Sequence, residues 1–264
     1  MTEREYRSNP SISRSDLWKM HESPEKFLYY REHPQEPTPA LIFGQVVHKL
    51  LLQPESFDEE FALLPDVDRR TKEGKAAYSA FLEASVGKTT VGAEMYDTAR
   101  SMVEKALQVE LVRTLLSGKK EVPFFWADDV TGIYCKCRVD CITEIGDQII
   151  IVDYKSCTDA SNDSFMKDAV KYGYTLQAAM YSDGVERNKG KRPVFVFIAQ
   201  EKTEPFSVNI FQADERFVQY GQDIFREYMG LLRYCTDTGD WYGYLGKTGI
   251  LNTLSLPNWL AKGE

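Results

Sequence analysis

The stretch Ile149-Ile150-Ile151-Val152-Asp153-Tyr154-Lys155 is an apolar run that ends in a charged pair, and it decides the fold. Its consecutive aliphatic residues indicate a buried strand. Because side chains alternate along a strand, Asp153 and Lys155 point to the same face. A buried strand that places a carboxylate and an ammonium on one face must pair these charges or use them, since isolated buried charges are costly.

A second strand is predicted upstream, and it carries another acid. Asp140 closes the run 133–140, thirteen residues before Asp153. Two carboxylates on adjacent strands could share Mg²⁺ or Mn²⁺, while Lys155 could orient a water or stabilise developing negative charge. This combination suits divalent-metal chemistry on phosphodiesters. The alternative is a salt bridge at a strand end, and the D-x-K pattern alone is too short to exclude it.

The remaining sequence predicts an α/β fold with a central mixed sheet flanked by helices. Helical patterns lie near 13–28 (broken at Pro24), 41–51, 78–82, 93–116, 174–181 and 214–233, and strand patterns lie near 120–127, 132–143, 148–156, 193–200 and 206–211. We expect one domain, with a mainly helical section over 1–118, the sheet and catalytic core over 119–212, and a C-terminal helix and tail over 213–264. Two domains are the alternative.

The composition is that of an ordinary globular protein. The chain has 264 residues, of which 43% are hydrophobic and 27% charged. The net charge of −8 argues against a general nucleic-acid coat protein, but not against an enzyme that confines positive potential to a channel. The polar N-terminus does not resemble a signal peptide, and no stretch approaches the roughly 18–20 apolar residues of a membrane span. We therefore expect a cytoplasmic protein without a membrane partner.

The cysteines are expected to be small core residues. None of the five forms a C-x-x-C motif. Cys135, Cys137 and Cys141 are predicted to share one strand face with Val139, which favours packing over metal or iron–sulfur ligation. Free thiols also fit a reducing cytoplasm.

Two further residues could join a metal site. Glu121 opens the strand near 120–127 and could line the same pocket as the aspartates, although a strand-end charge beside Lys119 and Lys120 is the alternative. His48 lies in an apolar helix one turn after Gly44, where a partner backbone or ligand could approach the imidazole. A hydrogen-bonded core histidine is the alternative reading of His48.

Gln177 and Tyr181 are four residues apart and therefore lie on one face of a helix. Their amide and phenol could bond phosphate oxygens or position the lysine, or the helix could simply pack on the sheet.

Basic residues supply candidates for DNA contact. Arg69, Arg70, Lys72 and Lys75 could hold a DNA backbone or a terminal phosphate, as could Arg138 beside Asp140. A solvated loop is the alternative for the first four, because acidic residues dilute their charge.

In combination these motifs resemble the PD-(D/E)XK nuclease superfamily, in particular the branch shared by RecB-type nuclease domains, Cas4 and the RecE exonuclease. The order that carries this resemblance is G-x-x-x-H (Gly44, His48), Glu121, Asp140, D-x-K (Asp153, Lys155) and Q-x-x-x-Y (Gln177, Tyr181). The stretches 11–17 and 70–75 are similar to RecE-type phage and prophage proteins, so the resemblance covers roughly residues 10–240.

The resemblance implies a Mg²⁺-dependent exonuclease, with Mn²⁺ as a second usable metal. Such an enzyme digests one strand of linear duplex DNA from its 5′ end and leaves a 3′ overhang for a single-strand annealing partner in recombination. The implied metal ligands are His48, Asp140, Asp153 and the backbone carbonyl of Tyr154, and the implied catalytic lysine is Lys155. Glu121 would be an outer acid, and Gln177 and Tyr181 would support the lysine and the DNA backbone.

Two departures from the superfamily pattern matter. Aspartate (Asp153) stands where the superfamily motif has glutamate, a change that the RecB-like branch tolerates. The four-cysteine arrangement of Cas4 and AddB is missing, so no iron–sulfur cluster is expected.

RecE-like and lambda-type exonucleases enclose DNA in a ring of subunits with basic groups facing inward. The resemblance therefore implies a homo-oligomer, a trimer or a tetramer, whose outer surface can be acidic. The alternatives are a Cas4-like or repair nuclease of the same fold with other polarity or endonucleolytic action, and a non-catalytic DNA-end-binding recombination subunit.

Overall fold

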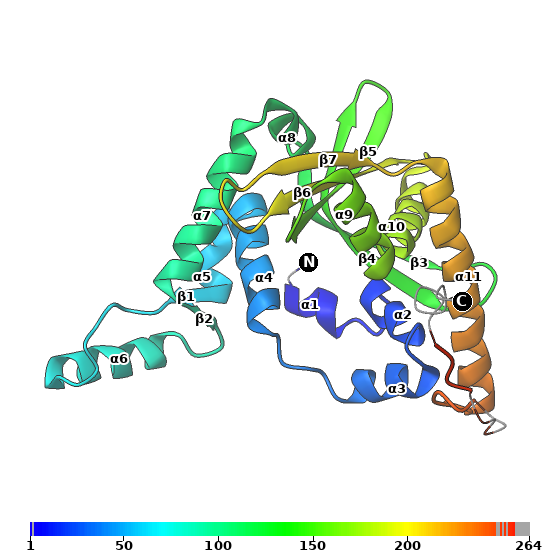
Figure 1. Ribbon diagram of the computed structural model, residues 1–264, viewed down its shortest axis with the longest axis horizontal. Helices are drawn as coiled ribbons and strands as arrows, with labels where there is room; N and C mark the ends of the chain where they lie inside the picture. The colour runs from blue at the N-terminus through cyan, green and yellow to red at the C-terminus, as the bar shows by residue number, and fades with distance from the viewer. Residues whose placement is uncertain (2, 247–248, 250, 252, 257–264) are drawn as a thin grey trace.

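The computed structural model describes residues 1, 3–246, 249, 251 and 253–256, so residues 257–264 of the expected C-terminal section lie outside the described residues. Its centre is a five-stranded sheet in the order β3-β4-β5-β6-β7 (Figure 1). β5 and β6 are parallel, and the other neighbours are antiparallel. The expected mixed α/β fold is confirmed. The strands of this sheet are β3 (Lys119–Ala127), β4 (Tyr134–Ile145), β5 (Gln148–Cys157), β6 (Val194–Glu201) and β7 (Val208–Gln212).

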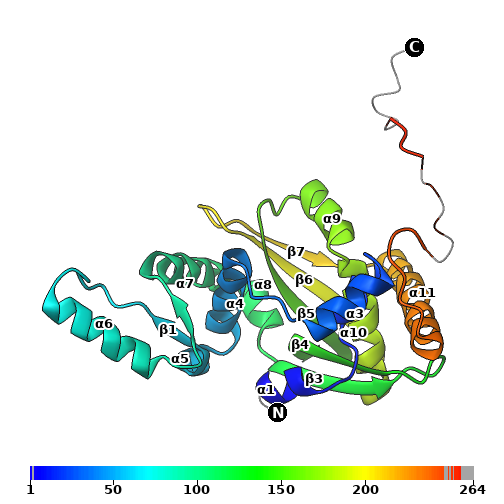
Figure 2. The same cartoon turned by 90° about the horizontal axis from the view of Figure 1, so that it is seen from below.

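Helices cover both faces of the sheet, and each face has its own hydrophobic cluster (Figure 2). On one face α10 and α11 pack with α2, α3 and α9, and on the other α4 packs with α7 and α8. The helices are α1 (Glu3–Ser8), α2 (Arg14–Met20), α3 (Pro24–Glu32), α4 (Pro39–Leu52), α5 (Phe57–Glu60), α6 (Lys72–Ala84), α7 (Ala93–Gln108), α8 (Glu110–Leu115), α9 (Asn162–Lys171), α10 (Tyr174–Lys189) and α11 (Glu215–Thr238), with a 3-10 turn η1 (Pro54–Ser56). No helix in the described part of the chain is long and apolar enough to cross a membrane.

The sequence pattern located the start of α2 correctly. Ser13 caps this helix, because its side chain accepts a hydrogen bond from the Asp16 amide while Asp16 bonds back to the Ser13 amide. Pro24 begins α3 rather than continuing α2, since proline fits the first turn of a helix but not its interior.

Strand β4 changes its side-chain alternation near Asp140. Cys135, Cys137 and Val139 lie in the cluster under α10, whereas Cys141 lies in the opposite cluster with Val152. The expectation that Cys141 shares the face of the other two cysteines is therefore wrong. The reason is a local irregularity: β4 pairs with β5 only over 141–145, and the facing residue in β3, Glu121, has a positive φ of 51°.

The cysteines are buried core residues, as expected. Cys135, Cys137 and Cys141 are fully buried free thiols, and burial raises the pKa of each above its ordinary value. Their role is packing on the sheet.

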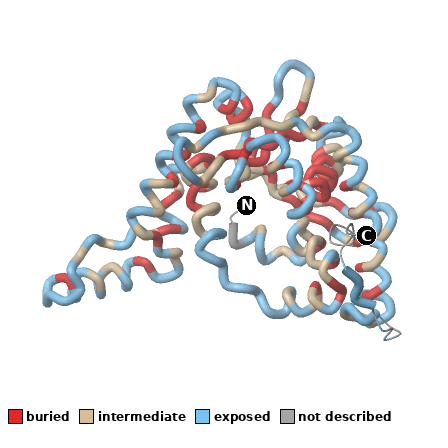
Figure 3. Tube along the Cα trace, viewed as in Figure 1, coloured by how far each residue is buried: buried red, intermediate tan, exposed pale blue. Residues whose placement is uncertain are grey.

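An arm projects from the body beyond α4 and α7. It consists of the parallel pair β1 (Phe61–Leu63) and β2 (Thr89–Val91), joined by a connection that contains α6. Figures 1 and 2 show α6 extending away from the sheet, and Figure 3 shows it almost wholly exposed, with Gly74 as its buried residue.

Helix α2 packs against the turn between α9 and α10. Gly173 has a φ of 66°, and a Cβ placed on it would lie 2.5 Å from the Trp18 ring. Glycine is therefore required here both for the backbone conformation and for the close approach of α2.

We expect Gly173→Ala to lower the free energy of unfolding by about 2–4 kcal/mol, because alanine resists positive φ and collides with Trp18. Urea unfolding measures the change. Gly230→Ala in α11 is the matched control: it is exposed with open space around it, and should raise stability by about 0.5–1 kcal/mol. Equal effects of the two substitutions would contradict this account of the turn.

Candidate metal centre

The candidate site lies where β4 parts from β5. Asp140 Oδ2 accepts a hydrogen bond of 2.8 Å from the Tyr154 amide, at the position where the ladder between the two strands has ended. His48 Nε2 lies 3.0 Å from the same Asp140 oxygen and 3.1 Å from the Tyr154 carbonyl oxygen. The fold thus brings together His48, Asp140 and the backbone of Tyr154, although 106 residues separate the histidine from the tyrosine.

Helix α4 positions His48 over β5. The neighbouring Val46 and Val47 are fully buried and anchor the helix in the cluster on that face of the sheet. At Gly44 a Cβ would meet Ser156 Oγ at 3.8 Å, an ordinary contact. Among the described residues no backbone approaches Gly44 closely, and the approach of a ligand at this glycine stays a prediction.

Glu121 completes a cluster of three side chains. Its Oε1 lies 3.9 Å from His48 Nδ1, and its Oε2 lies 2.6 Å from Arg138 Nε. One ligand atom each from His48, Glu121 and Asp140 lie within 4.8 Å of one another, which would allow them to share one ion. The positive φ of Glu121 helps to set this geometry, since it interrupts the regular pleat of β3 beside Asp140.

Asp153 lies beside this cluster and has its own partners. Its Oδ1 accepts a short hydrogen bond from Gln177 Nε2, and its Oδ2 lies 2.5 Å from Lys155 Nζ. Oδ2 is buried and accepts no hydrogen bond of good geometry from the described residues. Lys155 also lies over the Tyr174 ring, with Nζ 4.9 Å from the ring centroid. Asp153 and Lys155 share one face of β5, as the alternation predicted.

The charges of His48, Asp140 and Asp153 shift one another's pKa values. Burial raises the pKa of Asp153 to about 6, and the Asp140 charge adds to that rise while Lys155 opposes it. Burial favours a low pKa for His48, but the Asp140 and Glu121 carboxylates outweigh it and raise this pKa well above the ordinary value. Burial would also raise the pKa of Asp140, and the His48 charge outweighs that effect and lowers it. These carboxylates are held close together, so a cation between them would be stabilised.

The donor set fits a hard divalent cation. Carboxylate oxygens and a backbone carbonyl are the ligands that Mg²⁺ and Mn²⁺ prefer, and one imidazole nitrogen is compatible with Mn²⁺. The Asp153 carboxylate, whose Oδ2 is paired with Lys155, is an additional anionic group beside these ligands. The side chains present therefore fit a magnesium- or manganese-type site.

Helix α10 holds Gln177 and Tyr181 beside the same face of β5. Gln177 bonds to Asp153 rather than to Lys155, so it fixes the acid. Tyr181 packs near Phe195, with ring centroids 6.3 Å apart, and burial raises its pKa well above the ordinary value. Tyr181 is therefore a neutral phenol at physiological pH.

The structure separates the basic candidates into two places. Arg138 lies at the site through its contact with Glu121. Arg69, Arg70, Lys72 and Lys75 lie on the projecting arm and not at the metal cluster (Figure 1). There Arg70 pairs with Asp68 at 3.0 Å.

Two residues near the site carried no signal in the sequence analysis. Tyr174 contacts the Lys155 ammonium, and Arg14 Nη2 donates a short hydrogen bond to the Tyr172 carbonyl oxygen. Arg14 is 158 residues away from Tyr172 in sequence and reaches it only because α2 docks on the turn at Gly173. No local pattern in the sequence could have indicated that docking.

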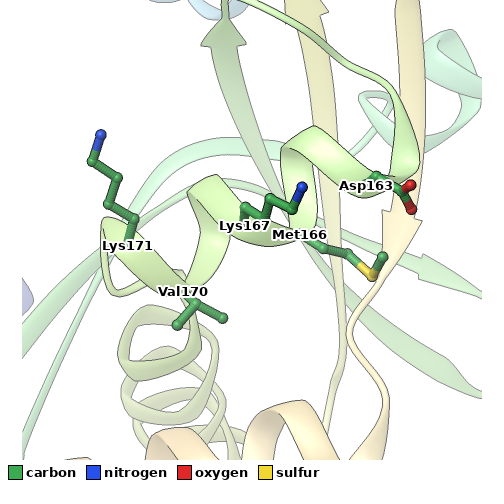
Figure 4. Close-up of a pocket in the computed structure, with 5 residues that line it drawn as sticks. All are labelled: Asp163, Met166, Lys167, Val170 and Lys171. Atoms are coloured by element: carbon green, nitrogen blue, oxygen red, sulfur yellow. The ribbon is translucent and has the colours of Figure 1, made fainter. Parts of the chain in front are cut away.

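An open hollow of about 540 Å³ lies on the outer surface of α9, away from these residues. Figure 4 shows its lining side chains pointing outward from the helix. None of the candidate site residues lines it. Its lining residues are Asp163, Met166, Lys167, Val170 and Lys171.

Comparisons with known proteins give a family and a fold. A family model described as "PDDEXK-like domain of unknown function (DUF3799)" matches residues 13–252. A crystal structure from Eubacterium rectale, described as a "putative exonuclease", has a TM-score of 0.66 and 15% identity, and the match covers 100% of this chain and 99% of that one. At this identity the likeness shows the fold alone. The structure of SSO0001 has a TM-score of 0.32 and 11% identity over 70% of this chain and 86% of that one, which is too weak to support an argument. No curated protein matches the chain.

Proposed function

The chain belongs to the PDDEXK-like family of unknown function (DUF3799), and from that premise we propose that it is a divalent-metal-dependent deoxyribonuclease. One observation carries the proposal: His48, Glu121 and Asp140 converge beside the Asp153–Lys155 pair at the point where β4 and β5 separate. Clustered buried acids next to a lysine are costly for folding, which favours a functional role for them.

We propose that His48, Asp140, Asp153 and the Tyr154 carbonyl hold the metal, with Glu121 beside them. When bound, a divalent cation neutralises charge on the phosphate and lowers the pKa of a coordinated water. Support comes from the distances of 3.0 and 3.1 Å that link His48 to Asp140 and Tyr154.

Lys155 is the proposed catalytic residue. Asp153 and the Tyr174 ring hold its ammonium, and Gln177 in turn fixes Asp153, so the lysine is oriented before substrate arrives. An ammonium in this position stabilises negative charge that develops on the phosphate oxygens and can orient the attacking water. Tyr181, as a neutral phenol, is a hydrogen-bond donor available beside Asp153.

The finer proposal is a 5′→3′ exonuclease that acts on linear duplex DNA and leaves 3′ overhangs for a single-strand annealing protein. It is supported by the order of the motifs and by the stretches 11–17 and 70–75, which resemble RecE-type proteins. The description of the Eubacterium rectale protein names an exonuclease, the broader class to which the proposed enzyme would belong.

A digestion experiment tests this function. Linear duplexes carrying different labels at the 5′ and 3′ ends of each strand are incubated with the protein and Mg²⁺. We expect the 5′ label to be released first, with covalently closed circular DNA left intact and with no cleavage in EDTA. Release of the 3′ label first would contradict the polarity, cleavage of closed circles would indicate an endonuclease, and DNA binding without cleavage would indicate a non-catalytic subunit.

We also propose that the protein is a homo-oligomeric ring around DNA, a trimer or a tetramer. The net charge of −8 supports this arrangement, because an isolated acidic subunit would bind long DNA weakly. Light scattering on the sample used for digestion gives the molar mass, and an active monomer would contradict the ring.

A further inference from the structure

The Arg14 guanidinium has donors that make no hydrogen bond with the described residues. It is the first residue of α2, and its Nη2 donates to the Tyr172 carbonyl oxygen while the guanidinium lies 5.5 Å from the Trp18 ring centroid. Its Nε is fully enclosed and makes no hydrogen bond with the described residues. Nη1 also makes no hydrogen bond with them, but it is not among the enclosed atoms and remains open to a ligand.

No carboxylate forms an ion pair with Arg14 among the described residues. Two cations of the candidate site do have such a partner: Arg138 Nε lies 2.6 Å from Glu121 Oε2, and Lys155 Nζ lies 2.5 Å from Asp153 Oδ2. Enclosing part of a guanidinium without a counter-ion destabilises a fold, since the enclosed part of the charge loses hydration and gains no compensating anion. This cost favours a role in ligand binding over a role in stability.

The side chain lies next to the proposed catalytic pair. Arg14 Nη2 bonds the carbonyl oxygen of Tyr172, whose ring centroid lies 6.1 Å from that of Tyr174. Tyr174 is also the residue whose ring contacts Lys155. Arg14 therefore borders the same space as the lysine, and it enters that space from α2, on the α10 side of the sheet.

We propose that Arg14 binds a phosphate of the DNA strand beside the scissile bond. The inference rests on the proposed nuclease function and adds a substrate contact to it. A phosphate supplies the missing anion, and the planar guanidinium donates through Nη1 to phosphate oxygens while Nη2 stays anchored on Tyr172. The phosphate could be an internal diester or the phosphate at a 5′ end, which share this chemistry.

The competing explanation is that Arg14 only fastens α2 to the turn before α10. The two explanations predict opposite signs for stability. If Arg14 only holds α2 against the turn, its substitution lowers the melting temperature. If Arg14 is an uncompensated cation, its substitution leaves the melting temperature unchanged or raises it. Arg14→Met separates them because methionine keeps much of the side-chain volume and removes the charge. Arg14→Lys keeps the charge and loses the planar fork.

The test measures binding of a short, fluorescently labelled blunt duplex by anisotropy in EDTA, where no cleavage occurs. We expect Arg14→Met to weaken binding by about 10- to 100-fold and Arg14→Lys to weaken it less. Losing one phosphate contact should also lower the slope of log affinity against log salt by about 1. The melting temperature of Arg14→Met should equal or exceed that of the wild type. Arg233→Gln, an exposed arginine of α11, is the matched control and should change neither quantity.

Running the series with 5′-phosphorylated and 5′-hydroxyl duplexes identifies the source of the phosphate. An equal loss on both supports an internal phosphate, and a loss confined to the phosphorylated duplex supports the end phosphate. Wild-type affinity and salt slope in Arg14→Met, or a clear fall in its melting temperature with the salt slope unchanged, would overturn the inference. If wild-type protein cleaves DNA and Arg14→Met does so equally well, the inference fails alone. If the wild type neither binds nor cleaves DNA, the proposed function fails as well.

Discussion

Replacing Lys155 with alanine will reduce the rate of DNA cleavage by about 10²- to 10³-fold. The lysine is oriented by Asp153 at 2.5 Å and by the Tyr174 ring, and a preorganised cation of this kind stabilises charge that appears only in the transition state. Single-turnover cleavage of a linear duplex at saturating Mg²⁺ measures the effect, because it excludes product release from the measured rate.

Lys171→Ala is the matched control for this substitution. Lys171 lies at the end of α9, outside the candidate site, and its removal should leave the cleavage rate unchanged. DNA affinity in EDTA should change little in Lys155→Ala, since its principal loss is in the chemical step. Cleavage at the wild-type rate by Lys155→Ala would remove Lys155 from the proposed mechanism.

Asp140→Asn will weaken binding of divalent cations by about 100-fold or more. Asp140 is the residue that connects the site, because one of its oxygens contacts both His48 and the Tyr154 amide. Asparagine keeps a hydrogen-bond acceptor for that amide and removes the charge, so the fold should persist while the ligand set loses an anion. Calorimetric titration with Mn²⁺ measures this affinity independently of any nuclease activity.

Glu144→Gln provides the control on the same strand, since Glu144 is an exposed acid near the far end of β4. It should bind Mn²⁺ as the wild type does. Unchanged Mn²⁺ affinity in Asp140→Asn would contradict the assigned ligand set, and a larger loss in Glu121→Gln would move the ion toward the cluster of His48 and Glu121.

The sequence predicted the sheet well because strand signals are local. The apolar run before Asp153 and the cysteine-containing run before Asp140 became the neighbouring strands β5 and β4. What it could not predict depends on contacts between distant segments. Cys141 changed faces because β4 leaves β5 at Asp140, and no pattern within β4 records that separation.

The candidate site was predicted through the order of its motifs rather than through the chemistry of single residues. Each of His48, Glu121 and Gln177 had an equally ordinary structural explanation when considered alone. Their assembly depends on how α4, β3 and α10 pack on β5, which is a property of the whole fold. Arg14 went unassigned for the same reason, since its place at the Tyr172 carbonyl depends on the packing of Trp18 against Gly173.

The Asp140 carboxylate has a structural role in addition to its proposed role as a metal ligand. It accepts a hydrogen bond from the Tyr154 amide and so replaces a strand-to-strand bond where the ladder between β4 and β5 has ended. Relatives that have lost catalysis during evolution should therefore still retain an acceptor at this position, under selection for folding alone. Among the described residues the Lys155 side chain bonds no backbone group, and its ion-pair partner is the Asp153 side chain, so this pair can be lost together once activity is lost. Among homologues, the presence of the lysine is therefore a better indicator of catalytic activity than the presence of the Asp140 carboxylate.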